Sequence, residues 1–395
     1  MGASSNRTGV ALVKEVSWGV NPGTALKDTN FEGESLSFNV ESITSNSIRN
    51  DRQVTDLIQT GADCSGGLNV ELQYGGSDEF IIGALFSDGW VGVGGGAVET
   101  LTSGEVGSNL DFDLDATGNT ITLGSGVTHA MIVDQWFQLN GSTTDDGFHQ
   151  VVAVAGQEIT VTSITTTEVL DESDTATISG SYARNGTTRS SFYIERSHED
   201  ITQYFQYAGM VVNTMSLDFS ASSVLKSSFN FIGKSATNSQ TTEGTGSNDA
   251  AETTEYMNSV SNVGDVNIDG TAASSCLLQK VGIEINNNVR GLTSIGNLGF
   301  CGVSEGEANI SGSLDMYFKD EVMYDKYLAS TAFSLSIRVT SNNNDTYIFS
   351  LPSCKLNADT INASGKNSDV MENATFQAIM GSEGYTFQID KIPSP

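Results

Sequence analysis

Apolar and polar residues alternate along many short stretches of this chain. In residues 36–41 the apolar side chains are separated by serine, asparagine and glutamate, and residues 68–74 and 215–219 follow the same pattern. A period of two places apolar side chains on one face of a β-strand and polar side chains on the other. The pattern therefore predicts half-buried strands, whose apolar faces carry Leu36, Phe38, Val40, Leu68, Val70, Leu72, Met215, Leu217 and Phe219.

One longer arrangement occurs twice. Residues 65–86 read SGGLNVELQYGGSDEFIIGALF, and residues 310–331 read ISGSLDMYFKDEVMYDKYLAST. Each contains a glycine, an alternating strand, a polar break and an aromatic-led apolar stretch. Upstream, each is preceded by another alternating strand and a long polar loop with an arginine. Repetition of this kind indicates a duplicated supersecondary unit, whose copies are expected to pack or assemble alike.

Changes in composition divide the chain further. Residues 97–182 are rich in Thr, Gly and Asp and have almost no counterpart in the second copy, so we interpret them as a small inserted β domain at an exposed loop. Residues 235–257 are polar and are interpreted as a flexible linker. The predicted organisation is a first domain at 1–96 and 183–234, the insert at 97–182, the linker at 235–257 and a second domain at 258–395. Residues 200–210 are a candidate for a short helix between strands.

Charge and cysteine content narrow the class of protein. The formal net charge is −30, from 18 Lys and Arg against 48 Asp and Glu, which favours solubility and argues against a nucleic-acid-binding protein. The longest apolar run, residues 80–86, is too short to cross a bilayer, and residues 1–19 lack the apolar segment of a secretory signal. We therefore expect a protein made in the cytoplasm, with no membrane partner and with reduced thiols at Cys64, Cys276, Cys301 and Cys354.

Short motifs for catalysis or metal binding are weak. Residues 302–306 fit the G-x-S-x-G pattern, but no histidine follows Ser304. The alternating aspartates of residues 111–115 lack the glycine and glutamate of a calcium loop, so we expect an acidic strand face. The His-Glu-Asp sequence at 198–200 joins neighbours that do not generally face one another. We expect no catalytic residue, no metal and no cofactor.

Several longer stretches, in order along the chain, point to one family. They are GESLSFNVESITSNSIRNDRQVTDLIQTG with FIIGALFSDGW, then SFYIERSHEDITQYFQYAGMVVNTMSLDFSASSVLKSSFNFIGK, and in the second half EINNNVRGLTSIGNLG, ISGSLDMYF and YIFSLPSCKL. Together they resemble the tail tube proteins of bacteriophages with long non-contractile tails. The resemblance covers most of the chain outside the insert and the linker.

The resemblance implies a mainly β fold with two tandem tail-tube-type β-sandwich or barrel domains, one short helix in each, and a small inserted β domain as an outer decoration. In this family, inner strands of neighbouring subunits join into a barrel, and stacked rings form a tube. Six tube domains normally close a ring. Because this chain has two, the resemblance implies homotrimeric rings, with homohexameric rings as the alternative.

The resemblance also implies location and partners. The protein would lie in the virion tail after assembly in the host cytoplasm. Its partners would be other copies of itself, the tail terminator and tail tip proteins, and the tape measure protein. Double-stranded DNA would pass through the lumen without specific binding, because acidic side chains repel phosphate. The acidic residues predicted to line the lumen are Glu41, Glu71, Asp218, Glu284 and Asp315. The loops predicted to contact an adjacent ring or subunit carry Arg49, Asp51, Arg52, Asn287 and Arg290.

Two other classes of function remain open. A secreted, acidic, β-rich surface or adhesion protein would share this composition, although the missing export signal and the low count of 4 prolines argue against it. A glycan-degrading β enzyme is the other class, but no pair of carboxylates marks an active site.

Overall fold

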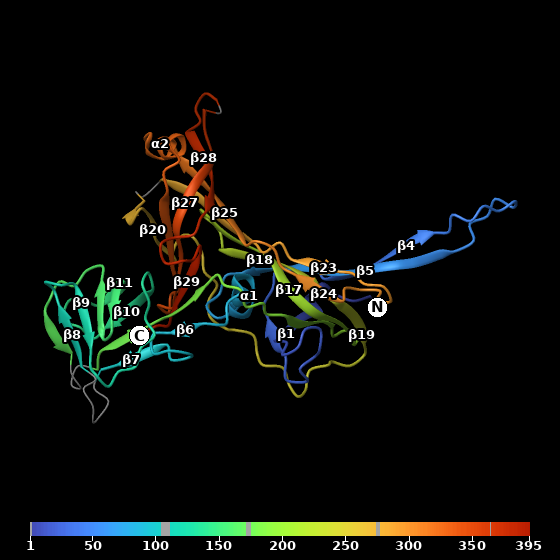
Figure 1. Cartoon of the computed structure of the whole chain (residues 1–395), viewed down its shortest axis with the longest axis horizontal. Helices are drawn as coiled ribbons and strands as arrows, with labels where there is room; N and C mark the ends of the chain where they lie inside the picture. The colour runs from blue at the N-terminus through green and yellow to red at the C-terminus, as the bar shows by residue number, and fades with distance from the viewer. Residues whose placement is uncertain (1, 104–110, 171–174, 274–276, 364) are drawn as a thin grey trace.

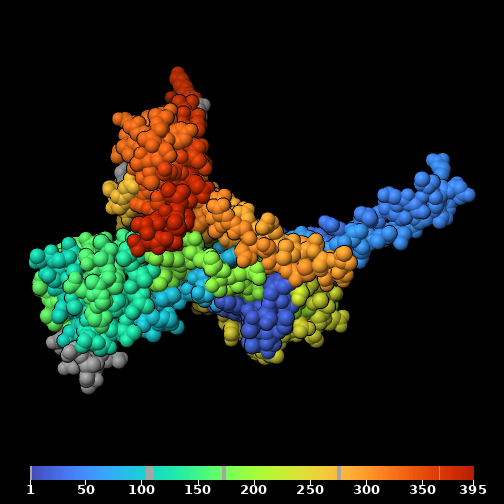
Figure 2. Space-filling model, viewed as in Figure 1, coloured from blue at the N-terminus to red at the C-terminus, as the bar shows by residue number. Residues whose placement is uncertain are grey.

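The computed structural model describes residues 2–103, 111–170, 175–273, 277–363 and 365–395. Figure 1 shows two β-rich bodies joined by paired strands, a smaller β body formed by residues 100–179, and a long hairpin that projects from the first body. In Figure 2 the hairpin extends away from the rest of the molecule as a narrow arm. The fold is mainly β, as predicted from the alternating pattern.

The first unit contains two strand layers joined by one long strand. The first half of that strand, β17, pairs with β16 and β19, and its second half pairs with β18. The elements of this unit are β1 (Thr8–Lys14), β2 (Lys27–Thr29), β3 (Gly33–Glu34), β4 (Ser37–Thr44), β5 (Leu57–Glu71), α1 (Asp78–Leu85), β16 (Phe192–His198), β17 (Gln203–Ser220), β18 (Lys226–Gly233) and β19 (Ser235–Ser239), after a short 3-10 helix at Ser5–Arg7.

The second unit has corresponding elements in the same order. Its long strand, β27, pairs with β26 and β29 through its first half and with β28 through its second half. The elements are β20 (Val263–Ile268), β21 (Thr271–Ala272), β22 (Leu278–Asn286), β23 (Arg290–Leu292), β24 (Gly302–Ser304), β25 (Asn309–Tyr317), α2 (Val322–Ala329), β26 (Phe333–Thr340), β27 (Thr346–Ala363), β28 (Val370–Ala378) and β29 (Gln388–Ile392).

The correspondence between the two units extends to single residues. β17 and β27 both have 18 residues. The pairing of β17 with β18 shifts register between Val212 and Thr214, and that of β27 with β28 shifts between Leu356 and Ala358. A β-bulge at the same place in both copies fixes the alignment, so Val212 corresponds to Leu356.

The glycines at the centre of the sequence repeat occupy equivalent places. Gly66 in β5 lies opposite Phe231, and Gly312 in β25 lies opposite Phe376. A Cβ atom at Gly66 would lie 2.4 Å from the carbonyl oxygen of Ser35, and one at Gly312 would lie 2.3 Å from a backbone carbonyl of the adjacent strand. Backbone segments approach so closely here that no side chain fits.

Neither short helix includes residues 200–210, so the prediction of a helix in that segment is wrong. From Gln203 onward these residues belong to β17, because strands on both sides supply backbone partners that override a local helical preference. The helices α1 and α2 instead follow β5 and β25, and end at Phe86 and Ser330, which both have φ of 50°. Neither of these two helices has the length and hydropathy that a membrane span requires.

The two units form one continuous sheet. The order of its inner strands is β4–β5–β18–β17–β22–β25–β28–β27, with β17 and β22 joining the units. A single hydrophobic core also runs through both units. The residues predicted as a linker begin with β19, which pairs with β17, so the first unit extends at least to Ser239.

The insert has its own sheet and core. Its eight strands lie within the range 97–182, in the order β13-β8-β9-β12-β11-β10-β14-β7. It packs on the second unit, where the Tyr385 hydroxyl donates to Asp134 (3.0 Å) and the Trp136 amide donates to Asp390 (3.2 Å). The strands are β7 (Thr100–Thr102), β8 (Phe112–Asp115), β9 (Thr120–Leu123), β10 (Trp136–Asn140), β11 (Gly147–Ala155), β12 (Glu158–Val161), β13 (Glu168–Leu170) and β14 (Thr177–Ser179), flanked by β6 (Val91–Gly92) and β15 (Ser181–Arg184).

Candidate functional site: a polar sheet face and two open strand edges

One face of the continuous sheet is polar across both units. Along each inner strand, apolar side chains turn into the core and the alternate side chains turn away from it, which is the half-buried arrangement predicted from the sequence. We call the outward set the polar face. It includes Glu41, Asn69, Glu71, Ser216, Asp218, Lys226, Ser228, Lys280, Glu284, Ser311, Asp315, Asn373 and Thr375.

The five acidic residues predicted for the lumen all lie on the polar face. Glu41 and Glu284 are exposed, and the other three are half-buried. The register places Lys226 between Glu71 and Asp218, and places Lys280 beside Asp315. Sequence reasoning missed both lysines, although each alternates with buried neighbours as the acidic residues do. Their role as lumen residues stays a prediction.

Lysines partly neutralise this face. The ammonium of Lys280 lies 2.7 Å from Asp218, and that of Lys226 lies 2.6 Å from Glu32. Burial alone would raise the pKa of Asp218, but hydrogen bonds from Lys280 and Ser220 outweigh burial and lower it. Asp218 therefore stays ionised while its charge is matched locally. The polar face is thus a mixed surface with an acidic excess.

Two strand edges of the continuous sheet are open. Among the described residues, β4 pairs only with β5, and the second half of β27 pairs only with β28. In the first unit the corresponding half of β17 is covered by β22, from Ser220 opposite Lys280 to Thr214 opposite Asn286. Unpaired edges are templates for further pairing, so the chain carries one open edge at each end of its inner sheet.

The internal repeat shows which strand of the second unit corresponds to the open edge strand β4 of the first unit. In the second unit, Ile310 of β25 pairs with Ile285 of β22, and in the first unit Cys64 of β5 pairs with Phe38 of β4. Since Gly312 corresponds to Gly66, Ile285 corresponds to Phe38. The strand β22, which covers β17, is therefore the counterpart of the segment β3–β4, which has an open edge.

The projecting arm is formed by the ends of β4 and β5 and the turn between them. Its apolar side chains are unusually exposed, including Ile48 (100%), Val54 (73%) and Leu57 (62%). At the turn, Arg49 and Asp51 form an ion pair of 2.5 Å, and the adjacent Arg52 is exposed. A two-stranded hairpin with apolar side chains in water is marginal on its own, so the arm is expected to contact another molecule.

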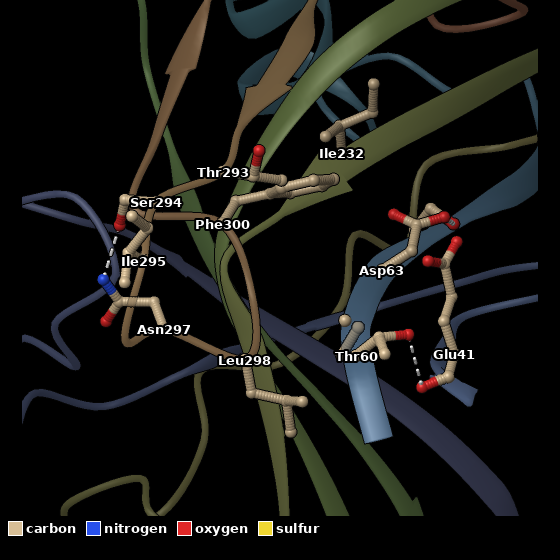
Figure 3. Close-up of a pocket in the computed structure, with 13 residues that line it drawn as sticks. Glu41, Thr60, Asp63, Ile232, Thr293, Ser294, Ile295, Asn297, Leu298 and Phe300 are labelled. Carbon is tan, nitrogen blue, oxygen red and sulfur yellow. Dashed lines mark hydrogen bonds between the residues drawn. The ribbon is translucent and has the colours of Figure 1, made fainter. Parts of the chain in front are cut away.

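A groove lies beside the root of the arm (Figure 3). Glu41 and Asp63 point into it from β4 and β5, opposite Phe300 and Leu298 of the segment between β23 and β24. Its volume is about 790 Å³. The amide of Ala62 donates to the carbonyl of Leu298 (2.7 Å). The second unit therefore reaches back and supports the arm of the same chain.

The segment 287–306 is anchored within the chain. The Asn287 side chain is buried and donates to the carbonyl oxygens of Ala84 (2.9 Å) and Val212 (3.3 Å). Arg290 is exposed on β23. A contact of either residue with another subunit stays a prediction.

The short motifs form separate structures. Residues 302–304 are a strand paired with β23 rather than a strand-to-helix turn. The aspartates at 113 and 115 alternate with buried residues in β8, as expected. His198 contacts Thr8 (3.1 Å), whereas Glu199 pairs with Arg7 (3.2 Å) and Asp200 accepts from the Ser4 amide (2.7 Å). Within the described ranges, no group of three or more His, Cys, Asp or Glu is arranged to hold a metal ion.

The described cysteines are free thiols. Cys64 and Cys354 are buried and Cys301 is exposed, while Cys276 lies outside the described residues. Burial raises the pKa of the Cys64 and Cys354 thiols to about 12. These two thiols are therefore protonated and unreactive at neutral pH.

Residues 5–378 match a family model described as phage tail tube protein. The matched range includes the first unit, the arm, the insert and the second unit as far as the end of β28. No curated protein matches the chain.

Proposed function

The chain belongs to the phage tail tube protein family, and we propose that three copies close into a ring of six units that stacks into the conduit for genomic DNA during ejection. The protein is then a structural component of the virion tail rather than an enzyme. The observation that carries the proposal is the pairing of β17 with β22, because it joins two equivalent units inside one chain.

Repeating this pairing between chains would close the ring. The open half of β27 is the counterpart of the covered half of β17, and open β4 is the counterpart of covering β22. Inside the chain, Thr214 lies opposite Asn286 and Met215 opposite Ile285. The same register between chains pairs Ala358 with Asn39 and Asp359 with Phe38. A closed barrel has no free lateral edge, which removes the hazard of runaway strand pairing.

In such a ring, the polar face would line the lumen. Across the two units together the face has an acidic excess, which would repel the phosphate backbone, while matched lysines would limit repulsion between subunits. The arm would reach an adjacent ring, where its exposed apolar residues would be buried. Tail terminator, tail tip and tape measure proteins are the further partners that this role requires.

A disulfide across the proposed junction tests the ring. Antiparallel partners have Cα atoms about 4.5–5.5 Å apart, which suits a disulfide. We expect Ala358→Cys with Asn39→Cys, in a Cys301→Ser background, to give covalently closed trimers on mild oxidation. The matched control is Ala358→Cys with Ile43→Cys, which lies about 13 Å further along the strand and should not cross-link. Native mass spectrometry counts the chains. Six chains in a closed ring, or no cross-link in assembled rings, would contradict the proposal.

A further inference from the structure

The second unit carries two acidic residues, one on its open edge strand β27 and one on the adjacent strand β28, that have uncharged counterparts in the first unit. Because Val212 corresponds to Leu356, Asp359 corresponds to Met215. On the paired strands, Leu217 lies opposite Ser227, and Ile361 lies opposite Glu372, so Glu372 corresponds to Ser227. Met215 and Ser227 are buried beside the in-chain junction.

The open edge of the first unit carries a charged pair that also has apolar counterparts. Glu34 lies opposite Leu68 and Val281 lies opposite Leu314, so these two positions correspond. Arg196 lies opposite Phe205 and Ile337 lies opposite Phe349, in equivalent strand pairs. Arg196 forms an ion pair with Glu34 at 2.9 Å, and both side chains are largely buried. Val281 and Ile337 are buried in the core.

Polar atoms on both edges have unused hydrogen-bonding capacity. Glu372 is 2% exposed and its Oε1 has no hydrogen-bond donor among the described residues. The carboxylate oxygens of Asp359 have no donor among the described residues except the adjacent Glu372 when it is protonated. The Nε of Arg196 is buried without an acceptor in the described chain. Leaving such groups buried and unpaired is costly. The unused donor, Arg196, is therefore at the open edge of the first unit, and the unused acceptors, Asp359 and Glu372, are at or next to the open edge of the second unit.

Arg196 lies at the open edge itself. Its guanidinium donates to the Leu36 carbonyl (3.2 Å), to which the Tyr207 hydroxyl also donates (3.0 Å). In the register of the proposed ring, Leu36 of one chain lies opposite Ile361 of the next, because Ile283 lies opposite Leu217 within the chain. Glu372 is one strand further, and neighbouring strands are about 4.8 Å apart, so two spacings, about 9.6 Å, separate Leu36 from Glu372 in the proposed ring. The side chains of Arg196 and Glu372 would span this gap together.

We propose that Arg196, held by Glu34 in one chain, pairs with Asp359 and Glu372 of the next chain. This inference rests on the proposed ring and specifies which side chains would join neighbouring chains in it. The junction between chains is charged, whereas the junction inside the chain is apolar. Two β27 edges would bring four carboxyl groups together and repel, so the cluster also disfavours wrong pairing of identical edges.

A neutral, isosteric variant tests the cluster. We expect Asp359→Asn with Glu372→Gln to raise the subunit concentration needed for ring formation by about tenfold or more, because Arg196 keeps Glu34 but loses its charged partners on the next chain. Sedimentation velocity measures this concentration. The matched control is Asn357→Asp, an exposed position on the same strand. Unfolding of the separated chains in urea checks that the variant still folds, and we expect no loss of stability.

A second variant keeps the test decisive if the first affects folding. Asp359→Met with Glu372→Ser gives the second edge the residues of the in-chain junction, and assembly should be weakened. Adding Glu34→Val and Arg196→Ile completes an apolar junction and should restore assembly. Unchanged or tighter rings in the neutral variant, or no restoration in the fourfold variant, would overturn the inference. Absence of the engineered cross-link between positions 39 and 358, in a protein that keeps the charged cluster, would instead overturn the ring itself.

Discussion

Asp359 occupies in the second unit the position that Met215 occupies in the first. Met215 lies in β17 and Asp359 in β27, and both strands have 18 residues. Each residue follows the β-bulge of its strand, in the half that pairs with the next strand along the chain, β18 or β28. Met215 is covered by β22 of its own chain, whereas Asp359 has no covering strand among the described residues. A duplicated fold therefore carries, at equivalent positions, a covered apolar strand and an open strand with an acidic residue.

The buried glycines of the repeat are expected to be intolerant of side chains. Gly66→Ala and Gly312→Ala should each lower the free energy of unfolding by about 1–3 kcal/mol, since a Cβ would contact backbone carbonyl atoms. The nearby Gly33→Ala is the matched control, because its Cβ would lie 3.9 Å from the nearest side-chain atom. Urea denaturation measures the difference. Equal stability of all three variants would contradict this account.

The stability of the separated chain should depend on Glu372. Burial and the adjacent Asp359 and Asp320 raise its pKa from 4.5 to about 7, and Lys319 and Lys326 line the same pocket. The folded chain thus retains a proton that the unfolded chain releases, so the free energy of unfolding falls as pH rises from about 4.5 to 7. Glu372→Gln should reduce this fall, as measured by urea denaturation at pH 5 and pH 8. The same slope in both proteins would show that Glu372 does not titrate in this range.

The exposed arm should control stacking but not ring closure. Burying one Ile or Val side chain contributes roughly 1.5–3 kcal/mol, so Ile48→Ser with Val54→Ser should abolish tubes while leaving rings. The exposed Thr55→Ser is the matched control. Electron microscopy distinguishes rings from tubes. Normal tubes formed by the double variant would exclude the arm from the contact between rings.

The insert should be dispensable for ring formation. The Gly180 amide donates to the Glu99 carbonyl (2.8 Å), so a short Gly/Ser linker can replace residues 100–179 without moving β6 or β15. Rings should still form, because the described contacts of the insert are with its own flanking segments, such as Arg184 of β15 with the Val133 carbonyl, and with outer strands of the second unit through Asp134 and Trp136. A folded product that forms no rings would give the insert a role in assembly.

Charge on the polar face should affect DNA passage. Glu71→Lys with Asp315→Lys should leave rings intact, since these side chains carry little packing energy, but should slow genome ejection. Even about 1 kcal/mol per close charge contact in water would add up over many rings. The effect should be largest at low salt, where screening is weakest. Ejection at the parental rate in low salt would show that these residues do not line the path or that their charge does not control transit.

The sequence by itself determined the class of structure and its duplication. Alternating residues such as Leu68 and Val70 marked the faces of the strands, and the glycines at 66 and 312 marked equivalent points in the two copies. These features are local or repeated in the chain, so periodicity reveals them. The residues of the polar face could be predicted for the same reason, because alternation alone separates them from the core.

Only the tertiary structure decided which strands cover one another. Residues 200–210 carry no local sign that β16 and β19 will hold them extended, which is why the sequence favours a short helix there. The open edges of β4 and β27 and the contact of the insert with the second unit depend on residues hundreds of positions apart. Arg196, Asp359 and Glu372 gained their significance only from that arrangement, since burial without a partner is a property of the folded chain.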